Sequence, residues 1–255
     1  MTKVLAITQA RSGSTRLPAK VFKEIQGKSL LAIHIDRASQ AKLIDVFHVA
    51  TTTSPGDADI VTLCDKLGVP SSRGSESNVL DRYYQAAKAY NPEWVVRVTS
   101  DCPLLDPALI DEVIQYAFDQ NVDYCANTLI EAYPDGQDIE VFKFSALEKA
   151  WKEAELDSDK EHVTPFIKRN SDFMGGTIFA SKNYAAPGNY NKVRLCVDEP
   201  IDMDVMTMLI DQHGLESDWM TYTKAYLESK EIRGLNENII RNEGYLKSLN
   251  EEKEH

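Results

Sequence analysis

The sequence predicts an α/β fold: a Rossmann-like, doubly wound and mostly parallel sheet with a small inserted subdomain. Strand-like and helix-like segments alternate through the first half of the 255-residue chain, which is typical of a parallel sheet with helices on both faces. Capping residues and prolines mark the expected helix starts, most clearly at Asp106-Pro107. The alternation stops after about Asn127. We therefore expect one domain over residues 1–255, with an inserted subdomain at approximately residues 128–190.

The elements of the first half follow from apolar periodicity and from residues that begin or end helices. Ser29, and either Ser77 or Asn78, can accept hydrogen bonds from the first N–H groups of a helix, and Gly68 can end one. The predicted strands are residues 3–9, 45–50, a short segment from Val69, and 94–99. The predicted helices are residues 29–41, 57–67, 79–89 and a helix that begins at Asp106.

The second half gives a less regular pattern. The predicted strands are residues 139–144 and two short segments near 176–180 and 192–197. The predicted helices are residues 145–155, 159–169 (interrupted by Pro165), 200–212, 221–229 and 236–249. The charged tail, residues 250–255, is expected to fray.

Composition excludes several classes of partner. The formal net charge is −12 and the pI is about 4.9, which argues against nucleic acids and anionic membranes because both require broad basic surfaces. No run approaches the ~18 apolar residues of a membrane span, and the N-terminus shows no signal-peptide pattern. The four cysteines are scattered without metal-binding spacing. We expect reduced thiols in a cytoplasmic protein, with no nucleic-acid or membrane partner.

The most informative segment is a basic loop, residues 9–20, that directly follows the first predicted strand. It combines small residues with Arg11, Arg16 and Lys20. Small residues let backbone N–H groups approach an anion, and the cations offer charge-assisted hydrogen bonds to phosphate oxygens. The loop matches neither the Walker nor the dinucleotide-binding fingerprint. Because ligands favour the carboxyl ends of strands in such sheets, we predict a phosphate-binding loop; a solvated connection is the alternative.

Two carboxylates stand at equivalent places along the chain. Asp101 follows the strand-like run 94–99, Asp198 follows the run 193–197, and each precedes a proline within two residues. Either could merely begin a turn or cap a helix. If both face the same crevice as the basic loop, they fit Mg²⁺, which takes one or two protein carboxylates and completes its shell with phosphates and water. The reaction class is then phosphoryl or nucleotidyl transfer.

These segments, taken in order, resemble the cytidylyltransferase family that activates sugars and sugar acids, which includes the CMP-sugar-acid synthetases. The closest resemblance is to the branch of spore coat polysaccharide biosynthesis protein F. The matching segments are residues 9–20, 73–75 with 79–84, 101–104, 133–142, 161–165 and 197–200. The family has the nucleotide-diphospho-sugar transferase type of fold, and the matches extend over almost the whole chain.

The resemblance implies a role for each matching residue. Arg11, Arg16 and Lys20 would contact the CTP triphosphate, and Asp101 and Asp198 would hold Mg²⁺. The remaining nucleotide-binding residues would be Ala10, Ser12, Gly13, Ser14, Ser75, Asp81 and Arg82. Asp138, Glu140, Glu161 and His162 would face the acceptor, a small sugar or sugar acid. The implied reaction transfers CMP from CTP to that acceptor, with release of pyrophosphate.

Other interpretations stay open at this stage. A glycosyltransferase that uses a nucleotide sugar is one, although Asp101-Cys102-Pro103 lacks the second Asp of a D-x-D motif. A non-catalytic nucleotide-binding protein is another. Glu140 could be a solvent-facing strand residue, and His162 a structural one. We also expect a homodimer built on residues 128–190, because apolar side chains gather there without an obvious second core: Phe142, Phe144, Trp151, Phe166, Phe173 and Ile178.

Overall fold

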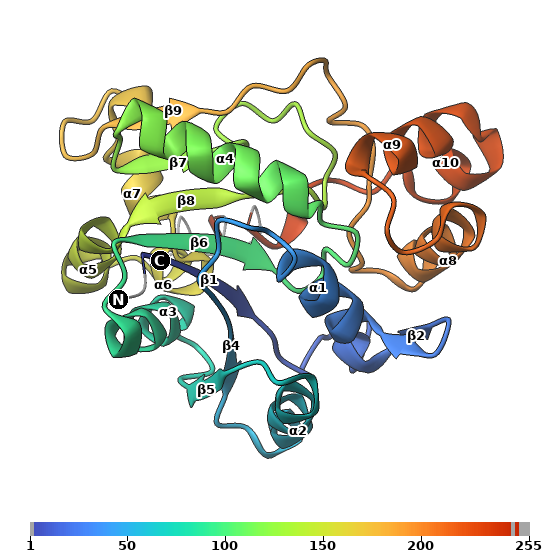
Figure 1. Ribbon diagram of the computed structural model, residues 1–255, viewed down its shortest axis with the longest axis horizontal. Helices are drawn as coiled ribbons and strands as arrows, with labels where there is room; N and C mark the ends of the chain where they lie inside the picture. Colours follow the sequence, from blue (N-terminus) through green and yellow to red (C-terminus); the bar gives the residue numbers. More distant parts are fainter. Residues whose placement is uncertain (1–2, 246–247, 250–255) are drawn as a thin grey trace.

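Seven strands form one sheet in the computed structural model, which describes residues 3–245 and 248–249 (Figure 1). In spatial order they are β5 (Ser71–Gly74), β4 (Val46–Thr52), β1 (Val4–Gln9), β6 (Trp94–Thr99), β8 (Glu140–Lys143), β7 (Tyr124–Ala126) and β9 (Ser181–Asn183). β8 runs antiparallel to both of its neighbours, and the other strand pairs of this sheet are parallel. The predicted α/β class with a mostly parallel sheet is confirmed.

Helices lie on both faces of this sheet, and the last three pack together beside it (Figure 1). The helices are α1 (Leu30–Ala38), α2 (Ala58–Leu67), α3 (Val79–Tyr90), α4 (Pro107–Gln120), α5 (Phe144–Glu153), α6 (Asp157–His162), α7 (Pro165–Arg169), α8 (Pro200–His213), α9 (Trp219–Glu228) and α10 (Lys230–Asn236). Short 3-10 turns are η1 (Lys20–Phe22), η2 (Pro55–Asp57) and η3 (Asp172–Met174), and a small hairpin joins β2 (Glu24–Ile25) to β3 (Lys28–Ser29). None of the helices in the described residues combines the length and apolarity that a membrane span requires.

The predicted capping residues act as expected. Ser29 accepts a hydrogen bond from the backbone N–H of Ala32, and Asn78 accepts one from Asp81. Asp106 accepts from two N–H groups of α4, whose first residue is a proline. Gly68 ends α2 in the left-handed region, at φ 69°. Local capping chemistry therefore fixes the helix boundaries on which the first half of the fold depends.

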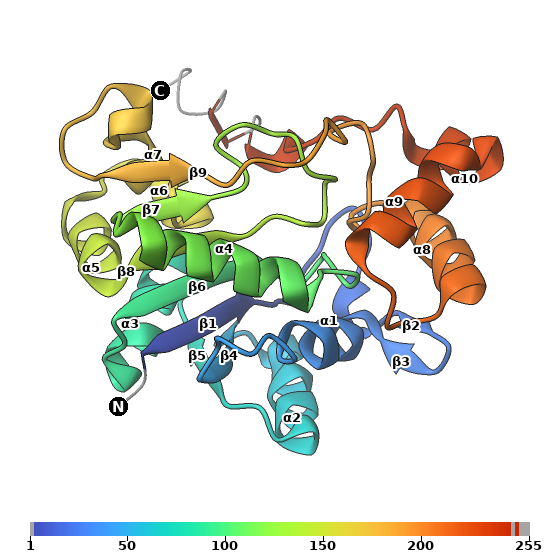
Figure 2. The ribbon, with the colours of Figure 1, turned by 45° about the horizontal axis from the view of Figure 1, so that its top comes forward.

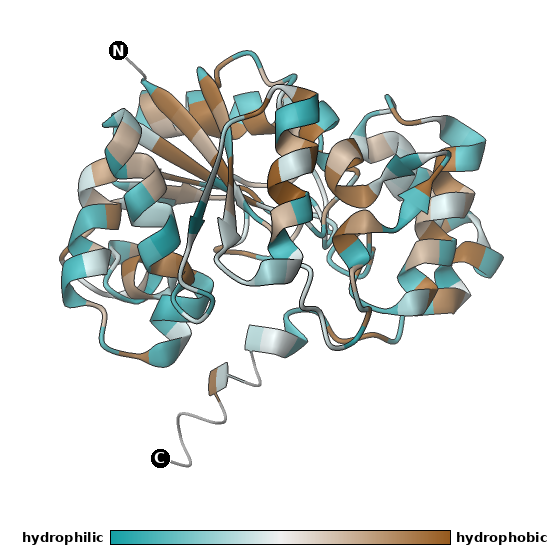
Figure 3. Ribbon diagram, turned by 90° about the horizontal axis from the view of Figure 1, so that it is seen from below, coloured by the Kyte–Doolittle hydropathy of each residue, from teal (hydrophilic) through white to brown (hydrophobic). Residues whose placement is uncertain are grey.

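Alternation along the central strand separates two apolar cores. Val4 and Ala6 of β1 pack with α1, α2 and α4 on one face, whereas Leu5 and Ile7 pack with α3 and α5 on the other. A strand buried on both faces is apolar on both, as β1 is over its first four residues, Val4 to Ile7. A third cluster joins α8, α9 and α10 to Leu30 and Ile33 of α1. Figure 3 shows the apolar strands enclosed by helices that carry hydrophilic residues.

The structure corrects several expectations for the second half. The helix predicted at residues 159–169 is divided between α6 and α7, because Val163 takes a positive φ of 72° before Pro165. The segments predicted as strands near 176–180 and 192–197 make only isolated bridges, Ser171 to Phe179 and Asp135 to Arg194. Both segments pair with loops rather than with strands, and no local sequence pattern distinguishes such a segment from a true strand.

The predicted helix over residues 236–249 is wrong in its first part and present in its second. α10 ends at Asn236, and Asn242 adopts a positive φ of 58° before helical residues resume at 243–245 and 248–249. Residues 246–247 and the tail predicted to fray, 250–255, lie outside the described residues. The sequence analysis also missed β7 and α10.

Residues 128–190 contribute directly to the main sheet. β8 inserts between β6 and β7, and β9 pairs with β7. Helices α5 and α6 pack against α3, on the face opposite α4. The segment is thus continuous with the principal core rather than a separate layer.

Candidate active site

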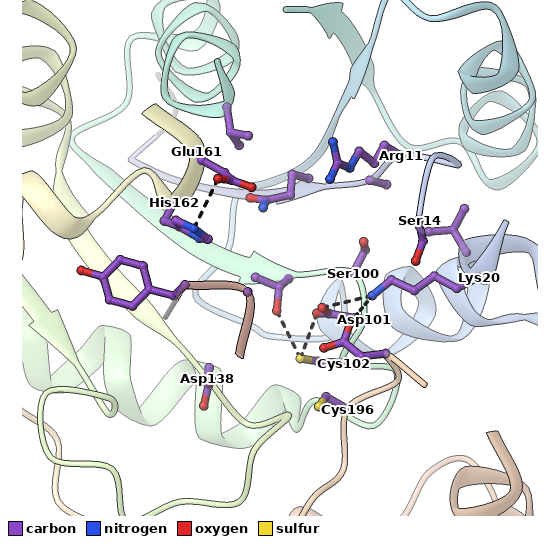
Figure 4. Close-up of a pocket in the computed structure, with 18 of the residues that line it drawn as sticks. Arg11, Ser14, Lys20, Ser100, Asp101, Cys102, Asp138, Glu161, His162 and Cys196 are labelled. Carbon is purple, nitrogen blue, oxygen red and sulfur yellow. Dashed lines mark hydrogen bonds and ion pairs between the residues drawn. The ribbon is translucent and has the colours of Figure 1, made fainter. Parts of the chain in front are cut away.

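A cavity of about 590 Å³ opens at the carboxyl ends of β1 and β6. Its walls come from the basic loop, from the end of β6, from the loop at residues 135–138, from α6 and from the chain that leads into α8. In Figure 4, Arg11, Ser14 and Lys20 lie on one side of the cavity and Glu161 and His162 on the other. Asp101 lies between these two groups, close to Lys20. The position is the one where ligands bind in open α/β sheets.

Lys20 joins the two carboxylates that the sequence placed at equivalent positions. Its ammonium lies 2.7 Å from Asp198 Oδ1 and 3.3 Å from Asp101 Oδ2, and it also donates to the carbonyl of Val197 at 3.0 Å. Burial favours the neutral amine, but the two carboxylates outweigh it and raise the pKa of Lys20. Burial likewise opposes ionisation of Asp101, yet Lys20 and nearby hydrogen bonds lower its pKa to about 2. Lys20 and Asp101 therefore form an ion pair at neutral pH.

Backbone pairing brings Asp101 and Asp198 together. The N–H of Val197 donates to the carbonyl of Asp101 at 2.8 Å. The backbone N–H of Asp198 donates to the carboxylate of Asp202 at 2.9 Å. Asp202 is itself held by the fork of Arg194, at 2.8 and 2.9 Å. The sequence did not decide whether Asp101 and Asp198 face one crevice. In the structure they do.

The basic loop is anchored from beneath. Ser12 donates from both its backbone N–H and its hydroxyl to Asp57 Oδ1, each at 2.7 Å, and its carbonyl accepts from Ala19 at 3.1 Å. Ala19 takes a left-handed φ of 54°, which turns the chain into η1 and directs Lys20 inward. Ser12 and Gly13 are not among the lining residues, so their place is in the support of the loop. Of the other predicted loop residues, Ala10, Arg11, Ser14, Arg16 and Lys20 line the cavity.

Arg82 is a buried arginine with unsatisfied guanidinium N–H groups. It is 4% exposed, it lines the cavity beside Arg11, and its Nε and Nη1 find no hydrogen-bond partner within the described part of the chain. Burial, and then the nearby Arg11, lower its pKa. A buried charge without a partner is costly unless a ligand neutralises it. This part of the cavity is therefore suited to an anion.

Besides Ser12 and Gly13, two further predicted nucleotide residues, Ser75 and Asp81, do not line the cavity. Asp81 accepts from the indole of Trp151 at 2.9 Å and from Gln85 at 3.0 Å. Ser75 accepts from the N–H of Asn78 at the start of α3. Their neighbours Glu76 and Ser77 line the cavity instead. The start of α3 therefore reaches the site, but through residues next to the predicted Ser75 and Asp81.

The side of the cavity opposite the basic loop carries three of the four predicted acceptor residues: Asp138, Glu161 and His162. Glu140 lies behind the wall, where it accepts from Arg97 and from Tyr124, each at 2.5 Å. Burial raises the pKa of Asp138 to about 7, although Arg241 lies 2.5 Å away and opposes the shift. Because Glu140 accepts a hydrogen bond from Arg97, it positions the guanidinium of that residue. Arg97, and not Glu140, lines the cavity.

The sequence analysis missed several lining residues. Arg97 and Arg194 both line the cavity. Each stands between apolar residues of a strand-like run, and a charged residue in such a run was the sequence feature that could have identified them. Asp135 pairs with Arg194 at 3.0 Å. Gly136, at φ 107°, lets the loop approach Leu195 so closely that a Cβ would lie 2.4 Å from its carbonyl oxygen. Residues 242–245 also line the cavity, and nothing in their sequence indicated it.

The carboxylates fit a magnesium ion on chemical grounds. Asp101 and Asp198 offer hard oxygen ligands, and the space between them already accommodates a cationic group, the ammonium of Lys20. Within residues 3–245 and 248–249 no group of three or more side chains could hold a metal ion. Two carboxylates suffice for Mg²⁺ when phosphates and water supply the rest of its shell.

The doubly wound sheet, and a cavity that joins an anion-binding basic wall to two carboxylates, define a nucleotide-binding α/β enzyme. The model of the cytidylyltransferase family matches residues 5–232. The chain belongs to the cytidylyltransferase family and is a nucleotidyltransferase.

Individual proteins agree with this assignment. An uncharacterized protein of Methanocaldococcus jannaschii is 37% identical, with 93% of this chain and 96% of the relative covered. Spore coat polysaccharide biosynthesis protein SpsF of Bacillus subtilis is 35% identical, with 86% and 90% covered. Among solved structures, a cytidylyltransferase from Leptospira borgpetersenii matches with a TM-score of 0.86 at 28% identity, covering 94% of this chain and all of that one.

Proposed function

We propose that this enzyme transfers CMP from CTP to a sugar or sugar acid, with Mg²⁺, in the synthesis of precursors for surface polysaccharides or other glycans. The observation that carries the proposal is the shared cavity. It joins cations suited to a triphosphate to the Asp101–Lys20–Asp198 cluster, with a separate polar region for an acceptor. The similarity to a polysaccharide biosynthesis protein supports the glycan context.

The basic wall accounts for the nucleotide. Arg11, Arg16 and Arg82 line one region, and Lys20 lies at its base. A triphosphate brings three to four negative charges, which these cations neutralise through charge-assisted hydrogen bonds. Arg16 now pairs with Asp198 at 3.0 Å and Glu243 at 3.0 Å, so binding would exchange carboxylate partners for phosphate. The same cations stabilise charge on the departing pyrophosphate.

The reaction needs no covalent enzyme intermediate. An oxygen of the acceptor forms a bond to the α-phosphorus, the bond from that phosphorus to the bridging oxygen of pyrophosphate breaks, and a hydroxyl proton of the acceptor leaves to solvent. Asp101 and Asp198 would hold Mg²⁺, which when bound offsets the repulsion between the acceptor oxygen and the phosphates. Lys20 keeps both carboxylates in place through its hydrogen bonds to them.

We also propose a homodimer that uses residues 128–190. Six large apolar side chains of that segment are at least one-third exposed: Ile130, Trp151, Leu156, Phe173, Met174 and Ile178. Phe142 and Phe166, which the sequence analysis grouped with them, lie in the core. Exposed apolar groups concentrated in one segment favour burial against a symmetry mate. Light scattering at micromolar concentration tests this: twice 28.7 kDa supports the dimer, and a monomeric mass overturns it.

We place the enzyme in the cytoplasm. All four cysteines are buried and free, which suits a reducing compartment where CTP is available.

A pyrophosphate-release screen tests the proposed function. Purified enzyme with Mg²⁺ is incubated with each of the four nucleoside triphosphates, crossed with a panel of sugar acids, neutral sugars and sugar phosphates. Release that requires both CTP and one acceptor class supports the proposal. Release with another triphosphate and not with CTP, or no release with any pair, overturns it.

A further inference from the structure

The chain that follows α10 returns across the molecule and forms part of the cavity wall. Figure 2 shows this red segment running back from α10 toward α6. We call the described residues 238–245 and 248–249 the C-terminal strap. Its residues Asn242, Glu243, Gly244 and Tyr245 line the cavity.

The strap is held to three separate parts of the fold. Arg241 donates to the carbonyl of Tyr133 at 2.9 Å and to Asp138 at 2.5 Å. Near its other end, Ser248 donates to Glu161 at 2.9 Å and lies 3.1 Å from His162 Nε2.

A third set of contacts ties the middle of the strap to the rest of the cavity. Asn242 donates to Glu131 at 2.8 Å, and Arg16 donates to Glu243 at 3.0 Å. Tyr245 packs edge-on against the ring of His162, with 5.0 Å between the centroids. A segment with this many specific contacts has a defined position in the wall.

The strap lies beyond the part of the chain that the family model matches. The family model ends at residue 232, before the strap begins. The matched part supplies the basic loop, Asp101, Asp198 and α6.

The acceptor region next to the strap contains cations that already have acidic partners. Arg97 pairs with Glu140, Arg194 with Asp135 and Asp202, and Arg241 with Asp138. Asn242 and Tyr245 of the strap, which line this region, carry an amide and a phenol, groups that suit the hydroxyl groups of a sugar. The ring of Tyr245 adds an apolar face beside them.

From this arrangement we propose that the strap is the specificity element for the acceptor, and that Asn242 and Tyr245 contact its hydroxyl-bearing part. The inference rests on the proposed function and assigns a role to residues beyond the matched part of the chain. Glu243 serves the nucleotide side through Arg16, so the strap contacts both halves of the cavity.

The test uses two conservative substitutions together, Asn242→Gly and Tyr245→Phe. Glycine tolerates the positive φ at residue 242, and phenylalanine keeps the packing on His162. The matched control is the double variant Lys224→Ala and Leu227→Ala, on exposed positions of α9 that do not line the cavity. Kinetics are measured with CTP and with the sugar that gives the fastest turnover in the screen above. Melting temperatures check that each variant folds.

The strap variant should raise KM for that sugar about tenfold, the effect of losing one or two hydrogen bonds, and change kcat and KM for CTP less than threefold. The control should match the parent enzyme in all three constants. An unchanged KM for the sugar would overturn the inference, as would an equal loss for CTP. Failure of the proposed function looks different: the unsubstituted enzyme itself would release no pyrophosphate with CTP and any sugar, which would remove the basis of both.

Discussion

The ammonium of Lys20 lies 2.7 Å from Asp198, although 178 residues separate them in the chain. The pair links the basic loop after β1 to the turn that begins α8, and Asp101 at the end of β6 completes the cluster. The two segments that the sequence marked as anion-binding and cation-binding are therefore one site. Its charge balance explains how carboxylates and phosphates can occupy the same cavity.

Asp101→Asn and Asp198→Asn should each reduce turnover at least about 100-fold, because each removes a metal ligand that stabilises charge in the transition state. Both variants should keep the folded structure, since neither residue lies in an apolar core. Steady-state pyrophosphate release at saturating Mg²⁺ measures the loss, and circular dichroism checks the fold. Near-normal activity in both variants would refute the metal assignment.

Lys20→Ala and Arg16→Ala should weaken binding of CTP far more than binding of CMP, because their partners would be the β- and γ-phosphates that CMP lacks. Titration calorimetry with both nucleotides measures the difference. Arg233→Ala is the control, since Arg233 is an exposed arginine of α10 that pairs with Glu237. Equal losses for CTP and CMP would place both side chains at another part of the ligand.

Arg82 and Arg37 form a matched pair of buried arginines with opposite surroundings. Arg37 donates to the backbone carbonyls of Leu105 at 3.1 Å and Ser217 at 3.0 Å, whereas Nε and Nη1 of Arg82 lack partners within the described residues. Arg82→Met should raise the free energy of unfolding of the nucleotide-free enzyme by about 1 kcal/mol, because it removes a buried cation whose Nε and Nη1 have no hydrogen-bond partner within the described residues. Arg37→Met should lower it by about 3 kcal/mol, because carbonyls lose their donors.

The same Arg82→Met variant should bind CTP at least tenfold more weakly, which is about 1.4 kcal/mol. Denaturant unfolding and calorimetry on one preparation give both quantities. Loss of stability together with unchanged CTP affinity would show that Arg82 is a structural residue.

The stability of the fold should fall in acid because of His48. Burial lowers the pKa of this imidazole to about 4, where it lies 3.0 Å from the hydroxyl of Tyr90 and 2.8 Å from that of Ser72. The unfolded chain, in which His48 keeps its ordinary pKa, binds a proton at this imidazole more tightly than the folded chain does. The free energy of unfolding is therefore highest above the ordinary histidine pKa and decreases as the pH falls toward 4. His48 alone should contribute a loss of about 2 kcal/mol between pH 7 and pH 5.

Urea unfolding of the parent enzyme and of His48→Gln at both pH values checks this. The variant should lose less stability over that interval by about the same amount. Parallel pH dependences in the two proteins would contradict the assignment.

Local chemistry explains which parts of the fold could be predicted. Ser29, Asn78 and Asp106 cap their helices within three residues, so α1, α3 and α4 are readable from the sequence. β7 has only three residues, and its partners β8 and β9 lie farther along the chain, so its identity as a strand depends on tertiary pairing.

The site follows the same rule. Lys20, Asp101 and Asp198 each follow a recognisable strand–loop pattern, and the cavity includes all three. The role of Glu140 depended on Arg97 and Tyr124, which meet it across neighbouring strands. The strap joins the cavity through Arg241 and Asp138, 103 residues apart, and no sequence pattern encodes such a contact.

Transfer of a labelled phosphate tests the central claim most directly. The enzyme is incubated with Mg²⁺, the acceptor found in the screen, and CTP labelled with ³²P at either the α- or the γ-phosphate; products are separated by chromatography. We predict that the α-label appears in the sugar product and the γ-label in pyrophosphate, because the acceptor oxygen attacks the α-phosphorus. A γ-label on the sugar, or α-label found only in free CMP, would contradict cytidylyl transfer.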